Sequence, residues 1–136
     1  MTGGRPEVSV GAVVVDDDRL LMIRRGHGPA AGTWSVPGGR VEWGETVAEA
    51  VVRELREEAG VDGLCGQFIG WVESISDDHH AVIMDFRVDL LEHAQPTAGD
   101  DAAEAAWVPL ADVAQRRLAP GLAQFLHDHG IIDTLV

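Results

Sequence analysis

The sequence lacks the features that define several large classes of protein. Its single cysteine, Cys65, excludes an internal disulfide and suits a reducing compartment. We expect it to be a small packed residue rather than a nucleophile. No hydrophobic run reaches the roughly 20 residues that a membrane span needs, and the N-terminus lacks a signal-peptide pattern. We therefore expect a cytoplasmic protein with no membrane partner.

Positive charge is scarce as well. Ten Lys and Arg residues stand against 23 Asp and Glu residues, which gives a formal net charge of −13 at pH 7. This excess of acid argues against non-specific binding to nucleic acid or anionic lipid, so we expect no nucleic-acid partner. A chain of 136 residues without repeats or low-complexity segments fits one domain. We assign residues 8–136 to that domain and residues 1–7 to a loose leader.

The middle of the chain has the local signals of a single helix. Thr46 followed by Glu49 forms a capping box, which predicts that the helix begins at Thr46. Gly60 stands where a left-handed residue commonly ends a helix. Apolar residues recur at helical spacing between these ends, as expected of a helix that packs on a core: Val47, Ala48, Ala50, Val51, Leu55 and Ala59.

Three glutamates continue this apolar stripe instead of opposing it. Val47 and Val51 predict apolar residues at positions 54 and 58, yet Glu54 and Glu58 stand there, and Glu57 lies one turn from Glu54. Like charges at this spacing repel, and burying an unpaired carboxylate costs more. A bound cation removes both penalties, and oxygen ligands favour Mg²⁺ or Mn²⁺. The alternative is a solvated acidic helix end, which the placement on the core side disfavours.

A glycine-rich loop precedes the helix. Pro37 is followed by Gly38 and Gly39, and consecutive glycines allow a backbone to approach a ligand closely. The amides or carbonyls of these glycines can therefore face a cation or a phosphate oxygen. Alone, Pro-Gly-Gly would indicate an ordinary tight turn. Beside three carboxylates, it indicates a place where a diphosphate can lie.

Residues 39–61 resemble the Nudix box, a long motif of glycine and glutamate positions at fixed spacing. Each fixed position is matched, in Gly39, Glu45, Arg53, Glu54, Leu55, Glu57, Glu58, Gly60 and Val61. The resemblance extends over residues 8–129, through Trp34-Ser-Val-Pro-Gly-Gly before the box and Trp107-Val-Pro-Leu-Ala-Asp-Val after it. It implies an α/β fold, a single-domain Nudix α/β/α sandwich with a mixed β-sheet between the helix at 46–59 and a closing helix.

The resemblance also implies roles for individual residues. Glu54, Glu57 and Glu58 would bind the metal, Mg²⁺ with Mn²⁺ as the alternative, and the Gly38 carbonyl would be a further ligand. Other positions of the motif would be structural, with an ion pair between loop and helix: Glu45, Arg53 and Gly60. The implied reaction is hydrolysis of a nucleoside diphosphate linked to another group, by attack of a metal-activated water on phosphorus.

The identity of the general base stays open among three glutamates. The family uses either a glutamate of the helix, here Glu57 or Glu58, or an acid on a late loop, here Glu104. Replacing Glu57 or Glu104 by Gln separates these hypotheses, because losing a general base lowers kcat by about 10²–10⁴-fold.

Other residues are candidates for substrate contacts. Arg24 or Arg25 could hold a phosphate, since a guanidinium suits phosphate oxygens, or the pair could simply balance an acidic surface. Trp34 and Trp43 are the tryptophans that we expect against a base. Gly39 would approach the diphosphate through its backbone.

His80 resembles a position of the ADP-ribose-type branch that contacts substrate. It follows His79 at the start of an expected strand, beside two aspartates. Adjacent strand residues point to opposite faces, so the two histidines cannot readily chelate one ion, and we disfavour a zinc site.

Alternation and turn residues predict the remaining elements. Strands are expected at 9–15, 20–24, 67–76, 81–90 and 104–109, with turns or loops at 16–18, 77–80 and 92–103, a short helix at 110–117 and the closing helix at 118–129.

Several functional hypotheses remain open. Residues 78–86 and 99–110 resemble enzymes that hydrolyse ADP-ribose or a related dinucleotide or NDP-sugar, which is our leading hypothesis. Residues 39–45 resemble enzymes that hydrolyse nucleoside triphosphates to monophosphate and pyrophosphate. A non-catalytic sensor of nucleotide metabolites is disfavoured because all the metal-ligand acids are retained. An acidic structural protein with chance glutamate spacing is a further alternative. A homodimer is common in this family and possible here.

Overall fold

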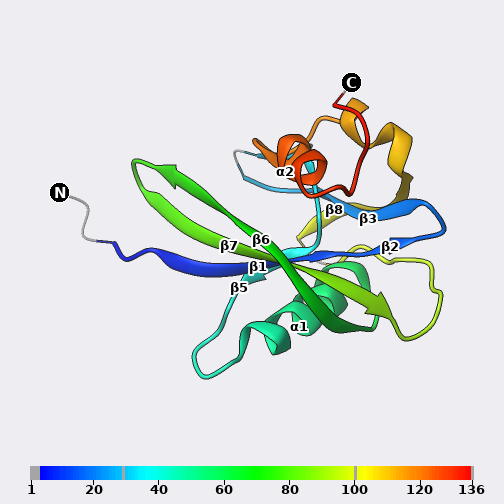
Figure 1. Cartoon of the computed structure of the whole chain (residues 1–136). Helices are drawn as coiled ribbons and strands as arrows, with labels where there is room; N and C mark the ends of the chain where they lie inside the picture. Colours follow the sequence, from blue (N-terminus) through cyan, green and yellow to red (C-terminus); the bar gives the residue numbers. More distant parts are fainter. Residues whose placement is uncertain (1–3, 29, 100, 136) are drawn as a thin grey trace.

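The structure is a computed structural model that describes residues 4–28, 30–99 and 101–135 (Figure 1). Within these residues, two four-stranded sheets form the framework. The first sheet, in the order β5-β1-β7-β6, contains β1 (Glu7–Val13), β5 (Gly38–Arg40), β6 (Gly63–Ser76) and β7 (His79–Leu90). β1 is parallel to β7 and antiparallel to β5, while β6 is antiparallel to β7. This sheet is therefore the mixed sheet expected of the fold class.

The second sheet is antiparallel throughout. It contains β2 (Val15–Asp16), β3 (Arg19–Arg25), β4 (Trp34–Ser35) and β8 (Ala102–Pro109), and β3 pairs with the other three. Asp17 and Asp18 join β2 to β3 with φ values of 53° and 57°. Positive φ at both central residues matches the right-handed twist of a hairpin, so the predicted acidic turn is confirmed.

Helix α1 (Val47–Ala59) is the element that the sequence predicted best. The Thr46 hydroxyl accepts from the Glu49 amide and the Glu49 carboxylate accepts from the Thr46 amide, so the capping box is present. Gly60 ends the helix at φ 65°. The buried face consists of Ala50, Val51, Leu55 and Ala59. It packs on the first sheet, on the side opposite helix α2 (Figure 1).

Two hydrophobic clusters hold these layers together. The first lies between α1 and the first sheet and includes Val10, Ala12 and Phe86. The second lies beneath the 3₁₀ helix η1 (Leu110–Gln115) and α2 (Leu122–Asp128). It is formed by the last residue of β1 together with residues of the second sheet and the C-terminal segment: Val13, Leu20, Met22, Trp34, Val108, Val113, Leu126, Ile131 and Ile132.

Several predicted boundaries differ from the structure. The closing helix covers only Leu122–Asp128, because Leu118 forms a bridge with Trp34 and Gly121 takes a φ of 81° ahead of the helix. β7 already begins at His79, so the predicted loop at 77–80 is confined to two residues. β1 begins at Glu7, which is in register with Ala81, so the last residue of the predicted leader belongs to the sheet. Residues 1–3 lie outside the described residues.

Among the described residues, no helix is both long enough and apolar enough to cross a membrane.

Candidate active site

Glu58 is fixed at the C-terminal end of α1 by the glycine loop. Its Oε1 atom accepts a hydrogen bond from the Gly38 amide at 2.6 Å. Burial raises the pKa of Glu58 to about 7, although the Gly38 hydrogen bond opposes this shift. The charges of Arg25 and Asp101 also act on Glu58, in opposite directions. The partly buried Glu58 carboxylate therefore faces the predicted glycine loop. Arg25 of β3 and Asp101, just before β8, are the charged groups that act on it from other elements.

Glu54 lies one turn earlier, against the backbone of Gly39. A Cβ atom at Gly39 would stand 2.5 Å from the carboxyl carbon of Glu54, so only glycine leaves room for this carboxylate. The Glu54 side chain is 14% exposed. Burial raises the pKa of Glu54, while the hydrogen bond from Arg53 lowers it. The spacing between Gly39 and Glu54 thus has a steric reason in this chain.

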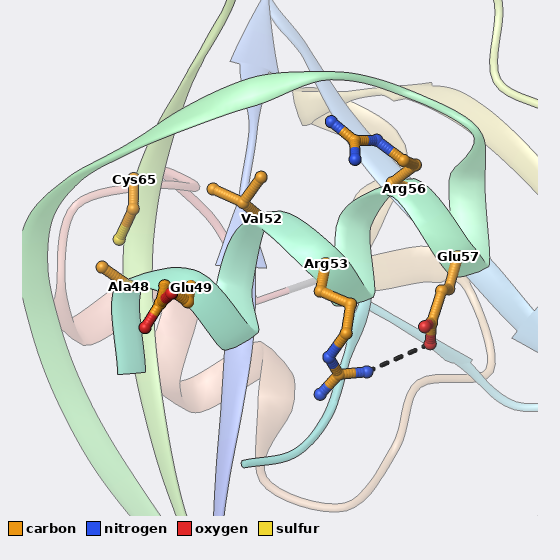
Figure 2. A pocket seen from close by; sticks show the side chains of 7 residues that line it. All are labelled: Ala48, Glu49, Val52, Arg53, Arg56, Glu57 and Cys65. Carbon is orange, nitrogen blue, oxygen red and sulfur yellow. Dashed lines mark hydrogen bonds and ion pairs between the residues drawn. The ribbon is translucent and has the colours of Figure 1, made fainter. Parts of the chain in front are cut away.

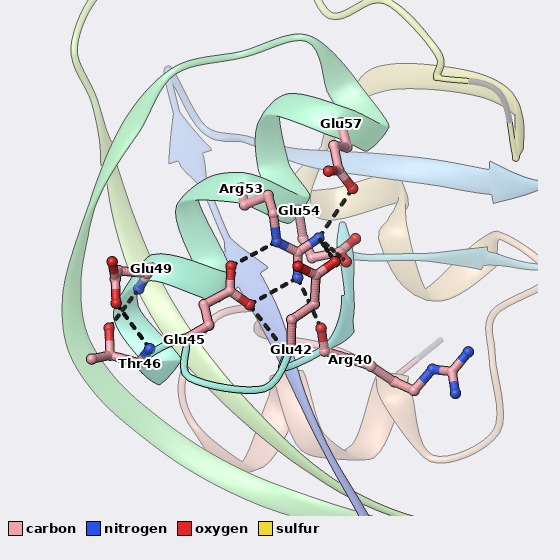
Figure 3. A network of polar contacts seen from close by, with 8 residues as sticks. All are labelled: Arg40, Glu42, Glu45, Thr46, Glu49, Arg53, Glu54 and Glu57. Carbon is pink, nitrogen blue, oxygen red and sulfur yellow. Dashed lines mark hydrogen bonds and ion pairs between the residues drawn. The ribbon is translucent and has the colours of Figure 1, made fainter.

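Arg53 is the centre of a polar network on the same helix (Figure 3). Its Nε and Nη2 atoms donate to the two oxygens of Glu45 at 2.7 and 3.0 Å. Its Nη2 also donates to the Arg40 carbonyl at 2.9 Å. The Nη1 atom donates to Glu54 at 2.8 Å and to Glu57 at 3.1 Å. The network ties the loop at 40–45 to α1, in the geometry that the resemblance implies for Glu45 and Arg53.

These contacts change the electrostatics of the network. The hydrogen bond from Arg53 holds the pKa of Glu45 below its ordinary value. The same carboxylate, with Glu54, raises the pKa of Arg53, so the guanidinium stays charged at any relevant pH. None of these bonds joins Arg53 to Glu58. Glu54 and Glu57 are therefore paired with a guanidinium, whereas Glu58 is paired with the Gly38 amide.

Glu57 is the most exposed of the three predicted ligands, with 58% of its side chain accessible. Together with Arg53 it lines a surface pocket of about 590 Å³ on the outer side of α1 (Figure 2). The other lining residues are Ala48, Glu49, Val52, Arg56 and Cys65. The pocket includes neither Glu54 nor Glu58, so it is a surface feature beside the site and not the site itself.

The three glutamates suit a hard divalent cation by their chemistry. They supply carboxylate oxygens within about one helical turn, and two of them are held in positions where burial raises the pKa of the carboxyl group. Among the described residues, however, no three acidic, histidine or cysteine side chains already stand together as a ligand set. The Arg53 Nη1 atom lies between Glu54 and Glu57 and holds both carboxylates. A cation would therefore have to take over oxygens that now bind Arg53.

The C-terminal end of α1 carries a contact that sequence reasoning missed. The amides of Thr97 and Gly99 donate to the carbonyls of Ala59 and Glu58 at 2.8 and 3.0 Å. A Cβ atom at Gly99 would collide with the Glu57 carbonyl oxygen. The loop at 97–99 thus packs on the helix end and brings β8 towards the acids. In the sequence, the only indication of this contact was Gly99 in a polar loop.

Three other candidates lie on β3 and β8. Glu104 is in register with Arg24, and their side chains form an ion pair at 3.5 Å. Arg25 is in register with Ala102, at an irregularity of the ladder. The charge of Arg25 lowers the pKa of Glu58, against the larger effect of burial, whereas Arg24 pairs with Glu104. The structure therefore places Glu104 beside a predicted phosphate-binding arginine.

The two tryptophans predicted to contact a base, Trp34 and Trp43, differ in their exposure. Trp34 is only 7% exposed and belongs to the second hydrophobic cluster, with Arg116 5.3 Å from its ring centre. This burial argues against the predicted contact of Trp34 with a base. Trp43 is fully exposed in the loop that leads to α1, where the prediction of a base contact stands untested.

His80 lies far from the acids. On β7 it is five residues before Asp85, the residue in register with Gly11, which pairs with Gly38. At about 3.3 Å per strand residue, that separation is about 17 Å along the sheet. Its Nε2 atom stands 3.7 Å from Glu73. The structure therefore does not bring His80 to the acidic site. His80 stands next to the turn of the β6–β7 hairpin, and this hairpin extends past the level of Gly38.

The comparison with known families agrees with this geometry. The model of the NUDIX domain family matches residues 5–129, which is most of the chain. The chain belongs to the NUDIX domain family.

Among similar proteins, a Nudix relative named ADP-ribose pyrophosphatase, from Methanocaldococcus jannaschii, is 38% identical over 107 residues. The match covers 77% of this chain and 63% of that protein, so this chain spans less than two thirds of its relative. CTP pyrophosphohydrolase of Escherichia coli is 38% identical over 61 residues, covering 44% of this chain and 45% of that protein.

Solved Nudix structures confirm the fold. A MutT NUDIX hydrolase from Burkholderia pseudomallei superposes with a TM-score of 0.78 at 29% identity, covering 91% of this chain and 98% of that one. The mixed α/β architecture predicted from the sequence is thus the Nudix fold.

Proposed function

We propose that this Nudix protein is a divalent-metal-dependent pyrophosphohydrolase. The observation that carries the proposal is the corner formed by the glycine loop and the end of α1. There the Gly38 amide holds Glu58 at 2.6 Å, and Glu54 fills the space over Gly39. A glycine backbone that lies so close to two partly buried carboxylates leaves room for a metal-bound diphosphate beside them.

In this proposal the residues of α1 have separate tasks. Glu54, Glu57 and Glu58 hold Mg²⁺ or Mn²⁺ together with the Gly38 carbonyl. The bound metal would lower the pKa of a coordinated water and neutralise charge on the diphosphate oxygens. Arg53 keeps the loop against the helix through three hydrogen bonds, two to Glu45 and one to the Arg40 carbonyl. Arg25, whose charge reaches Glu58, and Gly39, through its backbone, would hold the phosphate oxygens.

The general base is open between a helix glutamate and Glu104. The ion pair of Glu104 with Arg24 at 3.5 Å supports a role for Arg24 in aligning Glu104. Glu57 is the most accessible helix glutamate. Steady-state assays of Glu57→Gln and Glu104→Gln separate the two, because loss of the base lowers kcat by about 10²–10⁴-fold. A variant that keeps kcat within about tenfold does not carry the base.

The proposed substrate is ADP-ribose or a related nucleoside diphosphate linked to another group. The archaeal relative named ADP-ribose pyrophosphatase supports it, since that match covers 77% of this chain. A nucleoside triphosphate is the second candidate, supported by the shorter match to the bacterial CTP pyrophosphohydrolase.

Product analysis tests both substrates side by side. The purified chain with Mg²⁺ is incubated with ADP-ribose and with a set of nucleoside triphosphates, and Glu58→Gln is the control for contaminating enzymes. AMP and ribose 5-phosphate, with slow triphosphate turnover, support the first proposal. Nucleoside monophosphate and pyrophosphate from triphosphates support the second. Metal-dependent binding without turnover of any compound contradicts both and favours a sensor.

A further inference from the structure

The last turn of α1 carries two of the three predicted metal ligands. Glu57 and Glu58 stand directly before Ala59, the final residue of the helix. The last carbonyls of a helix have no partner within it, and an uncapped end frays. The positions of Glu57 and Glu58 therefore depend on the groups from outside the helix that cap this turn.

The loop at 93–99 caps this turn, where it passes beside the end of α1 (Figure 1). The Thr97 amide donates to the Ala59 carbonyl at 2.8 Å, and the Gly99 amide donates to the Glu58 carbonyl at 3.0 Å. Both bonds join segments that are distant in the sequence, so they form only in the folded chain. The end of α1 is thus fixed by a loop that belongs to another part of the fold.

Gly99 lies against the peptide unit that joins Glu57 to Glu58. A Cβ atom at Gly99 would collide with the Glu57 carbonyl oxygen, and it would stand 3.1 Å from the carbonyl carbon of Glu57 and 3.3 Å from the Cα atom of Glu58. Such crowding by backbone atoms leaves room for glycine alone. Gly99 therefore touches the main chain of both predicted ligands, and a side chain there would push the loop off the helix.

The loop at 93–99 is itself anchored to the second sheet. The Nδ1 atom of His93 lies 2.6 Å from a carboxylate oxygen of Asp16 on β2. The His93 ring also stacks on Trp107 of β8, with 6.3 Å between the ring centres, and Trp107 Nε1 donates to the Ala94 carbonyl at 3.0 Å. Because α1 packs on the first sheet, the loop ties the acidic end of α1 to the sheet that carries Arg25.

We propose that Gly99 is a positioning residue that, through the loop at 93–99, holds Glu57 and Glu58 in place for a divalent cation. The inference rests on the proposed function, which takes these glutamates as metal ligands. Gly99 does not bind the cation itself. It fixes the main chain from which both carboxylates extend, and the loss of groups that orient metal ligands typically weakens metal binding by about 10–100-fold.

Binding of Mn²⁺ without substrate tests this inference in Gly99→Ala. The added Cβ atom should displace the loop, while the buried face of α1 keeps the helix on the first sheet. We expect the Mn²⁺ Kd, measured by electron paramagnetic resonance titration, to rise at least about tenfold. Amide hydrogen exchange should be faster than in the wild type at residues 58–60 and unchanged at residues 51–55, because only the helix end opens.

Gly70→Ala is the matched control, because it also adds a Cβ atom at a crowded glycine. The new atom would stand 2.9 Å from the His129 ring, on β6 and away from the loop at 93–99. We expect this variant to lose stability and to keep the Mn²⁺ Kd of the wild type. A Kd that rises equally in Gly70→Ala and Gly99→Ala reflects lost stability alone and overturns the inference.

His93→Ala loosens the loop at its far anchor without adding bulk. It removes the contact with Asp16 and the stacking on Trp107, so the Mn²⁺ Kd should rise by about threefold. If Gly99→Ala does not fold, this variant decides the question. Faster exchange at residues 58–60 with a wild-type Mn²⁺ Kd, in every variant of the loop that folds, shows a purely structural role and overturns the inference.

Because metal binding is measured without turnover, this test is separate from the test of hydrolysis. Metal-dependent hydrolysis by the wild type, with a Mn²⁺ Kd that Gly99→Ala leaves unchanged, refutes the inference and leaves the proposed function standing. A Mn²⁺ Kd that depends on Gly99 in a chain that hydrolyses nothing refutes the proposed function alone. A wild type that binds no Mn²⁺ refutes both.

Discussion

The two ends of the acidic stripe on α1 differ although they carry the same residue type. Around Arg53, Glu45 and Glu54 share one guanidinium, which also contacts Glu57. At the end of the helix, Glu58 has a backbone amide as its partner, and burial raises its pKa to about 7. A carboxylate paired with Arg53 must give up that partner to bind a cation, whereas Glu58, held by an amide, has no cationic side chain to release. Identical side chains thus acquire different roles from their partners.

The largest effect should follow from removing the glutamate at the helix end. Glu58→Gln keeps the size of the side chain but loses the charge, and we expect the Mg²⁺-dependent kcat/KM to fall by at least about 100-fold. Glu73→Gln, an exposed acid on β6, is the matched control and should retain activity. Near-wild-type turnover by Glu58→Gln would remove Glu58 from the reaction.

Breaking the Arg53 network should act first on stability. Arg53→Ala leaves Glu45 and Glu54 without their guanidinium, and we expect the free energy of unfolding to fall by about 1–3 kcal/mol. Urea unfolding measures this change, and Arg56→Ala, whose partner Asp62 is exposed, is the control on the same helix. If Arg53→Ala and Arg56→Ala unfold at the same urea concentration, the network does not brace the loop.

The buried carboxyl groups should make the metal-free protein less stable as pH rises. Burial raises the pKa of Asp85 from 3.8 to about 7. Between these values the folded protein binds more protons than the unfolded one, so the free energy of unfolding falls with rising pH. Asp85→Asn should reduce this slope between about pH 4 and about pH 7, and Glu58 should retain its own share. Urea unfolding in chelator across this range gives the slope, and equal slopes in both proteins would contradict the shift.

The smallest effects should come from residues outside both ends of the stripe. Trp43→Ala removes a fully exposed ring, so the stability should change by less than about 0.5 kcal/mol, while KM rises if the ring contacts a base. His80→Ala, about 17 Å along the sheet from the level of Gly38, should leave kcat and KM unchanged. Steady-state kinetics of the two variants tests the placement, and a large loss in His80→Ala would show that the hairpin reaches the substrate.

The predicted and observed structures agree where the signals are local. The capping box at Thr46 and the left-handed Gly60 gave the ends of α1, because both depend on hydrogen bonds within a few residues. The closing helix was predicted too long, because the bridge between Leu118 and Trp34 joins distant segments. The same contact explains why Trp34 is buried and does not offer its ring to a base.

Local patterns alone therefore determined the helix, its apolar face and the spacing of its three glutamates, since helical periodicity and caps are properties of neighbouring residues. Only the tertiary structure decided which carboxylate would be paired. The Gly38 amide that binds Glu58 is 20 positions away in the sequence, and the guanidinium of Arg53 reaches Glu45 and the Arg40 carbonyl. The pKa of a carboxyl group depends on burial and on such distant partners, and neither can be read from the residues beside it.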